Sequence, residues 1–259
     1  MSPSELLMPR VQPHKSPLYE LLSCLLPTET QTWLLQACLW SDEPGRRAWA
    51  RWQKSISDPL AFLKQENEGV KGLLPLLYVA LRDNHAAVDA AFQTRLRTAY
   101  MRDELRNTAY RRVCQQVLSC LTATGVEPIV LKGAALADSV YPDLVLQHAH
   151  NVDLLLRDTD LSPAAKVLPS VGFAPLMPPH PPGRQAVKLS HESGLPLVLH
   201  QRLFRSPFYD IDPSDLWARS QVQHIADVPA HVLSPADTLI QLCVNAMSAK
   251  HQGTKEYFP

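Results

Sequence analysis

The chain has 259 residues, 46% of them hydrophobic, and its 25 basic side chains balance its 25 acidic ones. This length suits one large domain or two small ones with a sizeable core, and the zero net charge excludes the strongly positive surface of a general nucleic-acid binder. The scarcity of glycine (9 residues) beside 23 prolines favours helices with stiff connections over a turn-rich β-barrel.

The five cysteines follow neither a disulfide pattern nor a zinc-binding pattern. They include no CxxC pair, and most lie among apolar residues at helical spacing, so we expect reduced, buried thiols. Residues Met1–Lys15 lack a continuous apolar stretch, and the sequence holds no run of 18 apolar residues. These features predict a cytoplasmic protein without a membrane partner.

The first half of the chain is predicted to be helical after a flexible stretch at residues 1–15. The sequence Asp42-Glu43-Pro44-Gly45 is expected to break the chain between the second helix and the third. The expected helices cover residues 16–26, 28–40, 46–56 and 59–65, and another begins near Leu73 with Pro75 in its first turn.

A longer helix is predicted next. Neither proline nor glycine interrupts the segment from Ala86 to Thr124, and apolar residues recur along it at helical spacing. We expect Leu105 and Ala109 to belong to its buried stripe. Gly125 fits the position at which a left-handed residue ends a helix.

The pattern changes after Gly125 to a strand, a tight turn and a helix. Val126–Leu131 reads as a buried strand, Lys132-Gly133 as the turn and Ala134–Tyr141 as the helix. A glycine at such a turn lets backbone N–H groups approach a phosphate, and the start of the helix adds partial positive charge. Lys132 is expected to be solvated and available to such a phosphate.

Further strands are expected downstream. In the strand at residues 151–156, alternation places Asn151 and Asp153 on one face, and in the strand at 195–201 it places Val198 and His200 on one face. Glu192-Ser193-Gly194 suits a hairpin turn before the latter strand. An edge strand is expected at 172–176, a strand at 186–190, and helices at 215–219 and from Ser234 onward.

Taken together, these segments resemble bacterial nucleotidyltransferase-like proteins related to the polymerase-beta superfamily. The resemblance covers about two thirds of the chain, and its order and spacing are more specific than any single piece. The segments that carry it are LLPLLY (Leu73–Tyr78), IVLKGAALADSVYPD (Ile129–Asp143), VDLLL (Val152–Leu156), LVLHQRL (Leu197–Leu203) and LIQLCVNA (Leu239–Ala246).

The resemblance implies an α+β fold in four parts. A flexible N-terminus (1–15) precedes a helical region (16–124), a nucleotidyltransferase-like core with a mixed β-sheet flanked by helices (125–205) and a short C-terminal helical segment (206–259). In the family this core carries three carboxylates, two from a D-x-D strand and one from a neighbouring strand. They would hold two magnesium ions that clamp ATP or another nucleoside triphosphate.

This sequence matches that pattern only in part. Lys132 and Gly133 match the turn, Asp153 matches the second acid of the D-x-D pair, and His200 matches the histidine of the neighbouring strand. Two of the three acids are replaced, the first by Asn151 and the third by Val198. Outside the acids, the departures are Ala134 for a serine, Gln147 for an arginine and His150 for a glycine.

The functional hypotheses differ in how they account for the two missing acids. The resemblance favours a catalytically degenerate nucleotidyltransferase fold that binds a protein or peptide partner in a bacterial biosynthetic pathway, with magnesium binding weak or lost. The first alternative is an active enzyme that moves a nucleoside monophosphate to a hydroxyl, phosphate or peptide acceptor. It requires another acid to enter the site, and the candidates by sequence position are Asp143, Asp158, Glu192 and Asp210.

A second alternative is a protein with new chemistry in the old cleft. His148, His150 and His200 together with Asp153 offer nitrogen and oxygen ligands for zinc or nickel, or a setting for a small molecule. The chain also continues only as far as a short polar stretch, His251–Pro259, after the helix at Leu239–Met247, where family members usually add helices. Loss of acids and loss of this tail together favour a changed role.

Overall fold

The computed structural model describes residues 26–65, 70, 72–147, 151–175, 186–204 and 211–251. These fall into two compact units, one within residues 1–57 and one within 58–259. The helix expected at 16–26 lies outside the described residues, as do His148, His150 and Asp210. The four-part division of the chain stays a prediction.

The first unit is a pair of helices, α2 (Glu29–Leu39) and α3 (Asp42–Ser55). Thr28 caps α2 through a hydrogen bond from the Gln31 backbone, and the Gln31 side chain accepts one from the Thr28 backbone in return. The break expected at Asp42–Gly45 is wrong, because these residues form the first turn of α3. A first turn tolerates proline and is stabilised by acidic side chains near the positive end of the helix dipole.

The second unit begins with α4 (Pro59–Gln65), α6 (Leu74–Asp83) and α7 (Ala90–Ala123). Asp89 caps α7 by accepting hydrogen bonds from Ala91 N and Phe92 N. Gly125 follows the helix with φ of 77°, which confirms its predicted place at the helix end.

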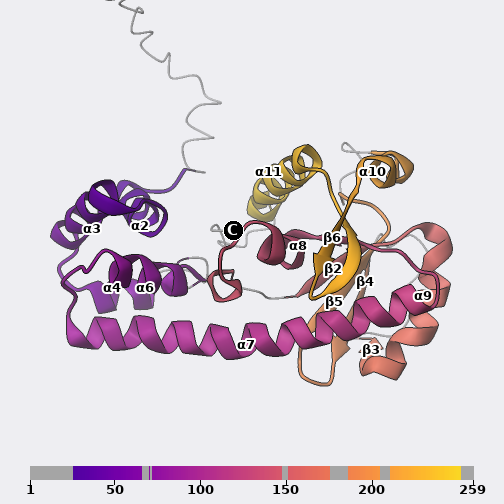
Figure 1. The fold of residues 1–259 in the computed structure, drawn as a ribbon. Helices are drawn as coiled ribbons and strands as arrows, with labels where there is room; N and C mark the ends of the chain where they lie inside the picture. Colours follow the sequence, from indigo (N-terminus) through magenta and orange to yellow (C-terminus); the bar gives the residue numbers. More distant parts are fainter. Residues whose placement is uncertain are drawn as a thin grey trace, which may run out of the picture. The chain divides into compact units, whose positions relative to one another are not determined.

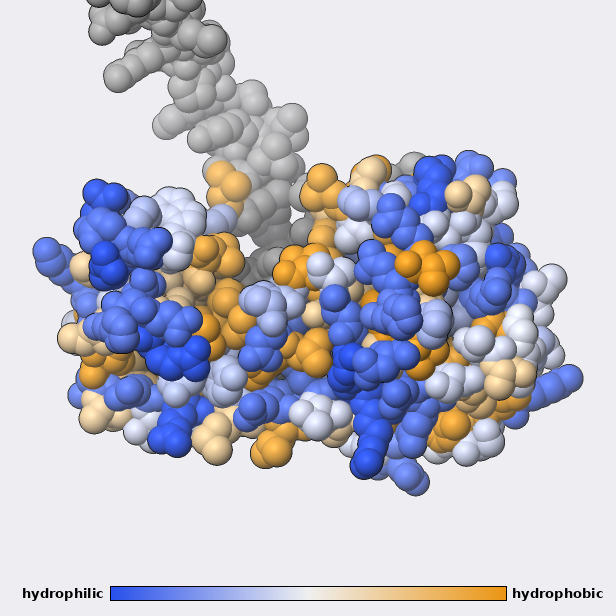
Figure 2. Space-filling view, viewed as in Figure 1, coloured by the Kyte–Doolittle hydropathy of each residue, from blue (hydrophilic) through white to orange (hydrophobic). Residues whose placement is uncertain are grey.

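The buried face of α7 differs from the prediction in its middle. Leu105 is 74% exposed and Ala109 is exposed, whereas Asp103 and Asn107 are buried. Ala99, Asp103 and Asn107 follow one another at four-residue spacing on the buried face of α7. This face is therefore polar at two successive turns of the helix. Hydrophobic and hydrophilic side chains are mixed over the surface shown in Figure 2, and an exposed apolar residue such as Leu105 is ordinary on a protein surface.

A seven-stranded mixed sheet forms the centre of this unit (Figure 1). Its strands follow the order β3-β4-β5-β2-β1-β7-β6. β2 pairs with β5 in parallel and with β1 in antiparallel fashion, and β1 pairs with β7 in parallel. The strands are β1 (Ile129–Leu131), β2 (Val152–Leu155), β3 (Phe173–Pro175), β4 (Ala186–His191), β5 (Pro196–His200), β6 (Gln221–Ile225) and β7 (Val228–Val232).

The hairpin of β6 and β7 was not predicted, since the segment after 206 is expected to be helical. β6 is mostly exposed and carries polar residues, and the sharp turn uses Ala226 and Asp227 at positive φ rather than a glycine. The chain therefore lacks the usual sequence mark of a hairpin. Pairing of β7 with β1 makes this hairpin part of the sheet.

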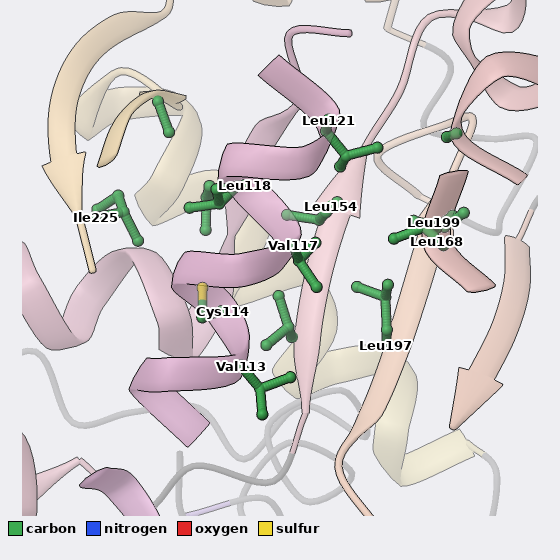
Figure 3. Packing of buried hydrophobic residues seen from close by; sticks show 14 of the residues in the cluster. Val113, Cys114, Val117, Leu118, Leu121, Leu154, Leu168, Leu197, Leu199 and Ile225 are labelled. Carbon is green, nitrogen blue, oxygen red and sulfur yellow. The ribbon is translucent and has the colours of Figure 1, made fainter. Parts of the chain in front are cut away.

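Helices cover both faces of the sheet. On one face the C-terminal half of α7 packs with Val130, Val152 and Leu154, together with α8 (Lys132–Ser139) and α9 (Leu161–Val167) (Figure 3). On the other face Leu131 and Leu155 pack with α10 (Pro213–Arg219) and α11 (Pro235–His251). Short 3-10 turns complete the unit at Leu144–Leu146 (η1), Asp158–Asp160 (η2) and Leu168–Val171 (η3).

The observed layers confirm the predicted α+β fold with a helical N-terminal region and a mixed sheet flanked by helices. No helix among the described residues is both long and apolar enough to cross a membrane.

Candidate functional site

Lys132 is the first residue of α8 and directly follows the end of β1, which lies between β2 and β7 inside the sheet. Lys132 has φ of 52°, a left-handed conformation that costs a residue with a side chain roughly 1–2 kcal/mol. Such strain persists only when surrounding contacts hold the residue in place, and it is concentrated at functional sites. The contact that holds Lys132 is an ion pair: Lys132 Nζ lies 3.0 Å from Asp153 Oδ1.

Asp153 is the centre of the site, and its side chain is 3% exposed. Besides Lys132, His200 Nε2 donates to Asp153 Oδ1 at 2.6 Å, and Asn151 Nδ2 donates to Asp153 Oδ2 at 2.8 Å. The structure thus brings together four of the residues singled out in the sequence: Lys132, Asn151, Asp153 and His200. Both oxygens of the carboxylate accept hydrogen bonds from side chains of the protein.

The electrostatics of Asp153 follow from these contacts. Burial opposes its ionisation, but the hydrogen bond from His200 and the positive charge of Lys132 outweigh burial, so the pKa of Asp153 is lower than that of an ordinary aspartate. The group is therefore a carboxylate at neutral pH. Its charge is balanced by Lys132, so the expectation that Lys132 is free in solvent is wrong.

Val198 occupies the neighbouring position on β5. Its Cα is paired with that of Asp153 across the parallel strands, and its side chain is buried. Val198 and His200 alternate with Leu197 and Leu199, which face α7, so Val198 lies on the Asp153 side of the sheet. An apolar side chain therefore stands where the resemblance expects a third carboxylate.

Gly133 follows Lys132, and the side chain of Gln147 closes the space above it. A Cβ atom built on Gly133 would lie 2.5 Å from Gln147 Nε2. The absence of a side chain at Gly133 allows this close approach, and the group that approaches is an amide of the same chain. Gln147 therefore fills the space that a side chain at position 133 would occupy.

The residues present do not fit a two-metal centre. Magnesium requires several hard oxygen ligands, and the described residues of this site offer one carboxylate, whose oxygens both already accept hydrogen bonds. Among the described residues, His, Cys, Asp and Glu side chains form no group of three or more that could hold a metal ion. The imidazole-based site is not tested as a whole, because His148 and His150 lie outside the described residues.

The candidate replacement acids have other contacts. Asp143 caps η1 by accepting from Val145 N, and Asp158 accepts from Gln201 Nε2 beyond the far end of β2. Glu192 lies at the turn between β4 and β5, where its backbone N–H donates to Gly172 O. None of the contacts of these three acids brings them to Asp153.

Asn107 is a polar residue of α7 that the sequence reasoning missed. Its Nδ2 donates to Leu144 O at 2.6 Å and to Gln147 O at 2.8 Å, which fixes the turn leading toward Asn151. Arg111, one turn further along α7, pairs with Asp138 of α8 and with Asp227 of the β6–β7 turn. The spacing could have predicted its burial, because Asn107 follows Ala99 and Asp103 at four-residue intervals on an otherwise apolar face of the helix.

One solved structure and one protein family are similar to this chain. A candidate nucleotidyltransferase from Thermotoga maritima shares 13% identity over 56% of this chain and 90% of its own, with a TM-score of 0.43. No curated protein matches the chain. A family model described as an uncharacterised nucleotidyltransferase matches residues 69–256. This match spans most of the chain and includes β1, β2, β5 and the Lys132–Asp153 pair, so the chain belongs to this nucleotidyltransferase family.

Proposed function

We propose that this protein uses the nucleotidyltransferase fold as a binding scaffold and does not carry out metal-dependent nucleotidyl transfer. The proposal rests on the hydrogen bonds that Lys132, His200 and Asn151 donate to the two carboxylate oxygens of Asp153. A catalytic carboxylate of this fold must present an oxygen to magnesium. Here the ammonium group of Lys132 supplies the positive charge that a metal ion would otherwise supply.

The replaced acids support the same conclusion. Asn151 contributes an amide that donates to Asp153, and Val198 contributes no ligand. Two magnesium ions carry four positive charges, and without the phosphates of a nucleotide the one carboxylate that the described residues place here does not balance them. We expect magnesium binding to be weak or lost, and a nucleotide, if it binds, to do so without a metal pair.

The catalytic half of the proposal is tested by pyrophosphate release. The full chain is incubated with each nucleoside triphosphate and Mg²⁺ or Mn²⁺, beside the Asp153→Ala variant. We expect the two proteins to give the same background rate. A rate above background that Asp153→Ala abolishes would show an active transferase and overturn the proposal.

The scaffold half is tested by purifying the full chain from its native host and identifying what remains bound. The chemical class we expect is a protein or peptide of a biosynthetic pathway. A partner that binds the purified protein directly, with a measurable Kd and without nucleotide turnover, supports the scaffold. A chain that retains only a metal ion or a small molecule would favour new chemistry in the old cleft instead.

A further inference from the structure

β6 (Gln221–Ile225) lies at one edge of the sheet, and among the described residues β7 is the only strand that pairs with it. Natural proteins commonly protect such edges from other chains with a proline, a charged side chain or a very short strand. β3, at the opposite edge, has three residues and ends at Pro175. β6 has five residues, QVQHI, and contains no proline, aspartate, glutamate, lysine or arginine. This edge therefore lacks the usual protection against a further strand.

The turn of the β6–β7 hairpin determines which backbone groups of β6 bond to β7. It consists of two residues, Ala226 and Asp227, both at positive φ. In a hairpin with a two-residue turn, the residues on either side of the turn form a hydrogen-bonded pair. Ile225 and Val228 hold these positions, so from this point hydrogen-bonded pairs alternate with non-hydrogen-bonded pairs along the ladder.

Val222 and His224 fall in the non-hydrogen-bonded positions. His224 is paired with Pro229, which has no N–H to donate, and Val222 is paired with His231. The N–H and C=O groups of Val222 and His224 therefore point away from β7, toward the outside of the sheet. Both residues are exposed, Val222 at 63%. The edge thus presents two sets of backbone donors and acceptors, roughly 7 Å apart along the strand.

An extended chain is the partner that matches this arrangement. Its own N–H and C=O groups alternate in direction with the same two-residue period, so it can bond to both sets at once. A helix cannot do this, because its backbone groups are bonded within the helix. Pairing β6 with β6 of a second copy would join only the two outward residues of each chain. That contact is far short of the roughly 1,200–2,000 Å² buried in a stable interface, so a peptide segment fits better.

A cavity of about 200 Å³ adjoins this edge. Val222 lines it together with residues of α7, β7 and the segment before β1. Apolar residues, among them Leu118 and Ala230, make up most of the lining, and Glu127 and His231 are its ionisable members. The volume equals the share of roughly seven water molecules in the liquid, which leaves room for one large apolar side chain.

We propose that β6 binds an extended peptide segment of the partner protein, which joins the sheet as an outer strand and places one apolar side chain in the cavity beside Val222. Main-chain hydrogen bonds to Val222 and His224 supply affinity, and the cavity supplies a preference for the side chain. This inference rests on the scaffold proposal, because it states how the partner is held.

The test uses peptides selected on the full chain from a phage library of random linear peptides, then synthesised and measured by calorimetry. Val222→Pro removes the outward N–H and leaves the bonds to β7 intact, and an edge strand tolerates proline at such a position. We expect it to bind the peptides about tenfold more weakly or worse, because a peptide carbonyl loses its donor. Val222→Thr keeps the N–H and the branched shape and should bind as the natural protein does. Melting curves establish that both variants fold.

Hydrogen exchange provides a second measurement that needs no variant. The amides of Val222 and His224 should exchange fast in the natural protein alone and about tenfold more slowly or less with peptide bound, whereas Gln223 should be slow in both states. The proposal is overturned if selection yields no binding peptide, if folded Val222→Pro binds equally well, or if the two amides stay unprotected.

Purification from the native host separates failure of this docking site from failure of the scaffold. A native partner that binds Val222→Pro with an unchanged Kd would leave the scaffold standing and exclude β6 as its site. A dimer of the natural protein that Val222→Pro dissociates would assign the edge to a second copy of this chain and contradict the peptide.

Discussion

Val198 lies directly beside Asp153 on the neighbouring parallel strand, on the same side of the sheet, and both side chains are buried. A valine and an aspartate in register cannot share a metal ion. The absence of a second carboxylate at this position leaves Asp153 to be neutralised by Lys132. The geometry suggests how a metal site could be rebuilt.

Asn151→Asp combined with Val198→Asp should restore divalent-ion binding. The three carboxylates repel one another without metal, so we expect the double variant in EDTA to lose about 2–4 kcal/mol of unfolding free energy. Saturating Mg²⁺ with ATP should recover about 2–3 kcal/mol, since a ligand that binds only the folded state stabilises it. Melting temperatures with and without Mg²⁺ and ATP measure both effects.

The matched control is Asn151→Asp with Val198→Asn, which has nearly the same shape and one charge fewer. It should show little rescue by Mg²⁺. If the folded double aspartate variant gains no stability from Mg²⁺ and ATP, the metal-binding geometry of the fold has been lost along with its acids.

Lys132→Ala should lower the unfolding free energy by about 1–2 kcal/mol, because it removes the charged partner of a buried carboxylate while His200 and Asn151 remain. The lysine side chain is 34% exposed, and solvent screening keeps the loss below that of a fully buried pair. Urea denaturation measures it. Lys166→Ala, at an exposed position of α9, is the control and should change stability by less than about 0.5 kcal/mol.

Comparing Lys132→Gly with Lys132→Ala separates the cost of the left-handed backbone from the loss of the ion pair. Glycine adopts φ near 52° without a steric penalty, so this variant should be more stable than Lys132→Ala by about 0.5–1 kcal/mol, although both lack the ion pair. Equal stability of the two variants would show that the left-handed turn relaxes when the lysine is removed.

The contribution of Asp153 to stability should depend on pH. Its pKa in the folded protein is lower than in the unfolded chain, where it is about 3.9, so the unfolded state binds more protons in the acid range. The stabilisation is complete at neutral pH and is lost as the pH falls from about 5 through the folded pKa.

We therefore expect the stability difference between the natural protein and Asp153→Asn to shrink between pH 6 and pH 3. Denaturant titrations at each pH give this difference. Asp158→Asn, whose side chain is 59% exposed, should stay close to the natural protein throughout. If the difference in unfolding free energy between the natural protein and Asp153→Asn does not vary with pH, the ionised carboxylate of Asp153 does not contribute to stability as we expect.

Asn107→Ala should cost about 2–3 kcal/mol, because it leaves the carbonyls of Leu144 and Gln147 without their donor. Hydrogen exchange should speed up first at residues 144–147, next to Asn151. Gln116→Ala, exposed on the same helix, is the control and should be nearly neutral. Slow exchange at 144–147 in Asn107→Ala would show that other contacts hold this turn.

Local patterns predicted most of the second unit's elements. The helix-spaced apolar residues of α7, the left-handed Gly125 and the short apolar strands β1, β2 and β5 follow from periods and turn residues that a sequence displays directly. The hairpin of β6 and β7 was not predicted, because its exposed polar residues and its glycine-free turn do not form a recognisable strand or turn pattern. Pairing with β1, more than 90 residues earlier in the chain, makes it part of the sheet.

By itself the sequence determined which side chains share a strand face, Asn151 with Asp153 and Val198 with His200, and its resemblance to nucleotidyltransferases predicted that the two strands are neighbours. Only the tertiary structure decided what they do to one another. Whether a lysine reaches solvent or a buried carboxylate depends on the backbone angle at one turn and on the register of β1, β2 and β5. The engaged carboxylate and the buried Asn107 are products of long-range packing, for which no local pattern of residues exists.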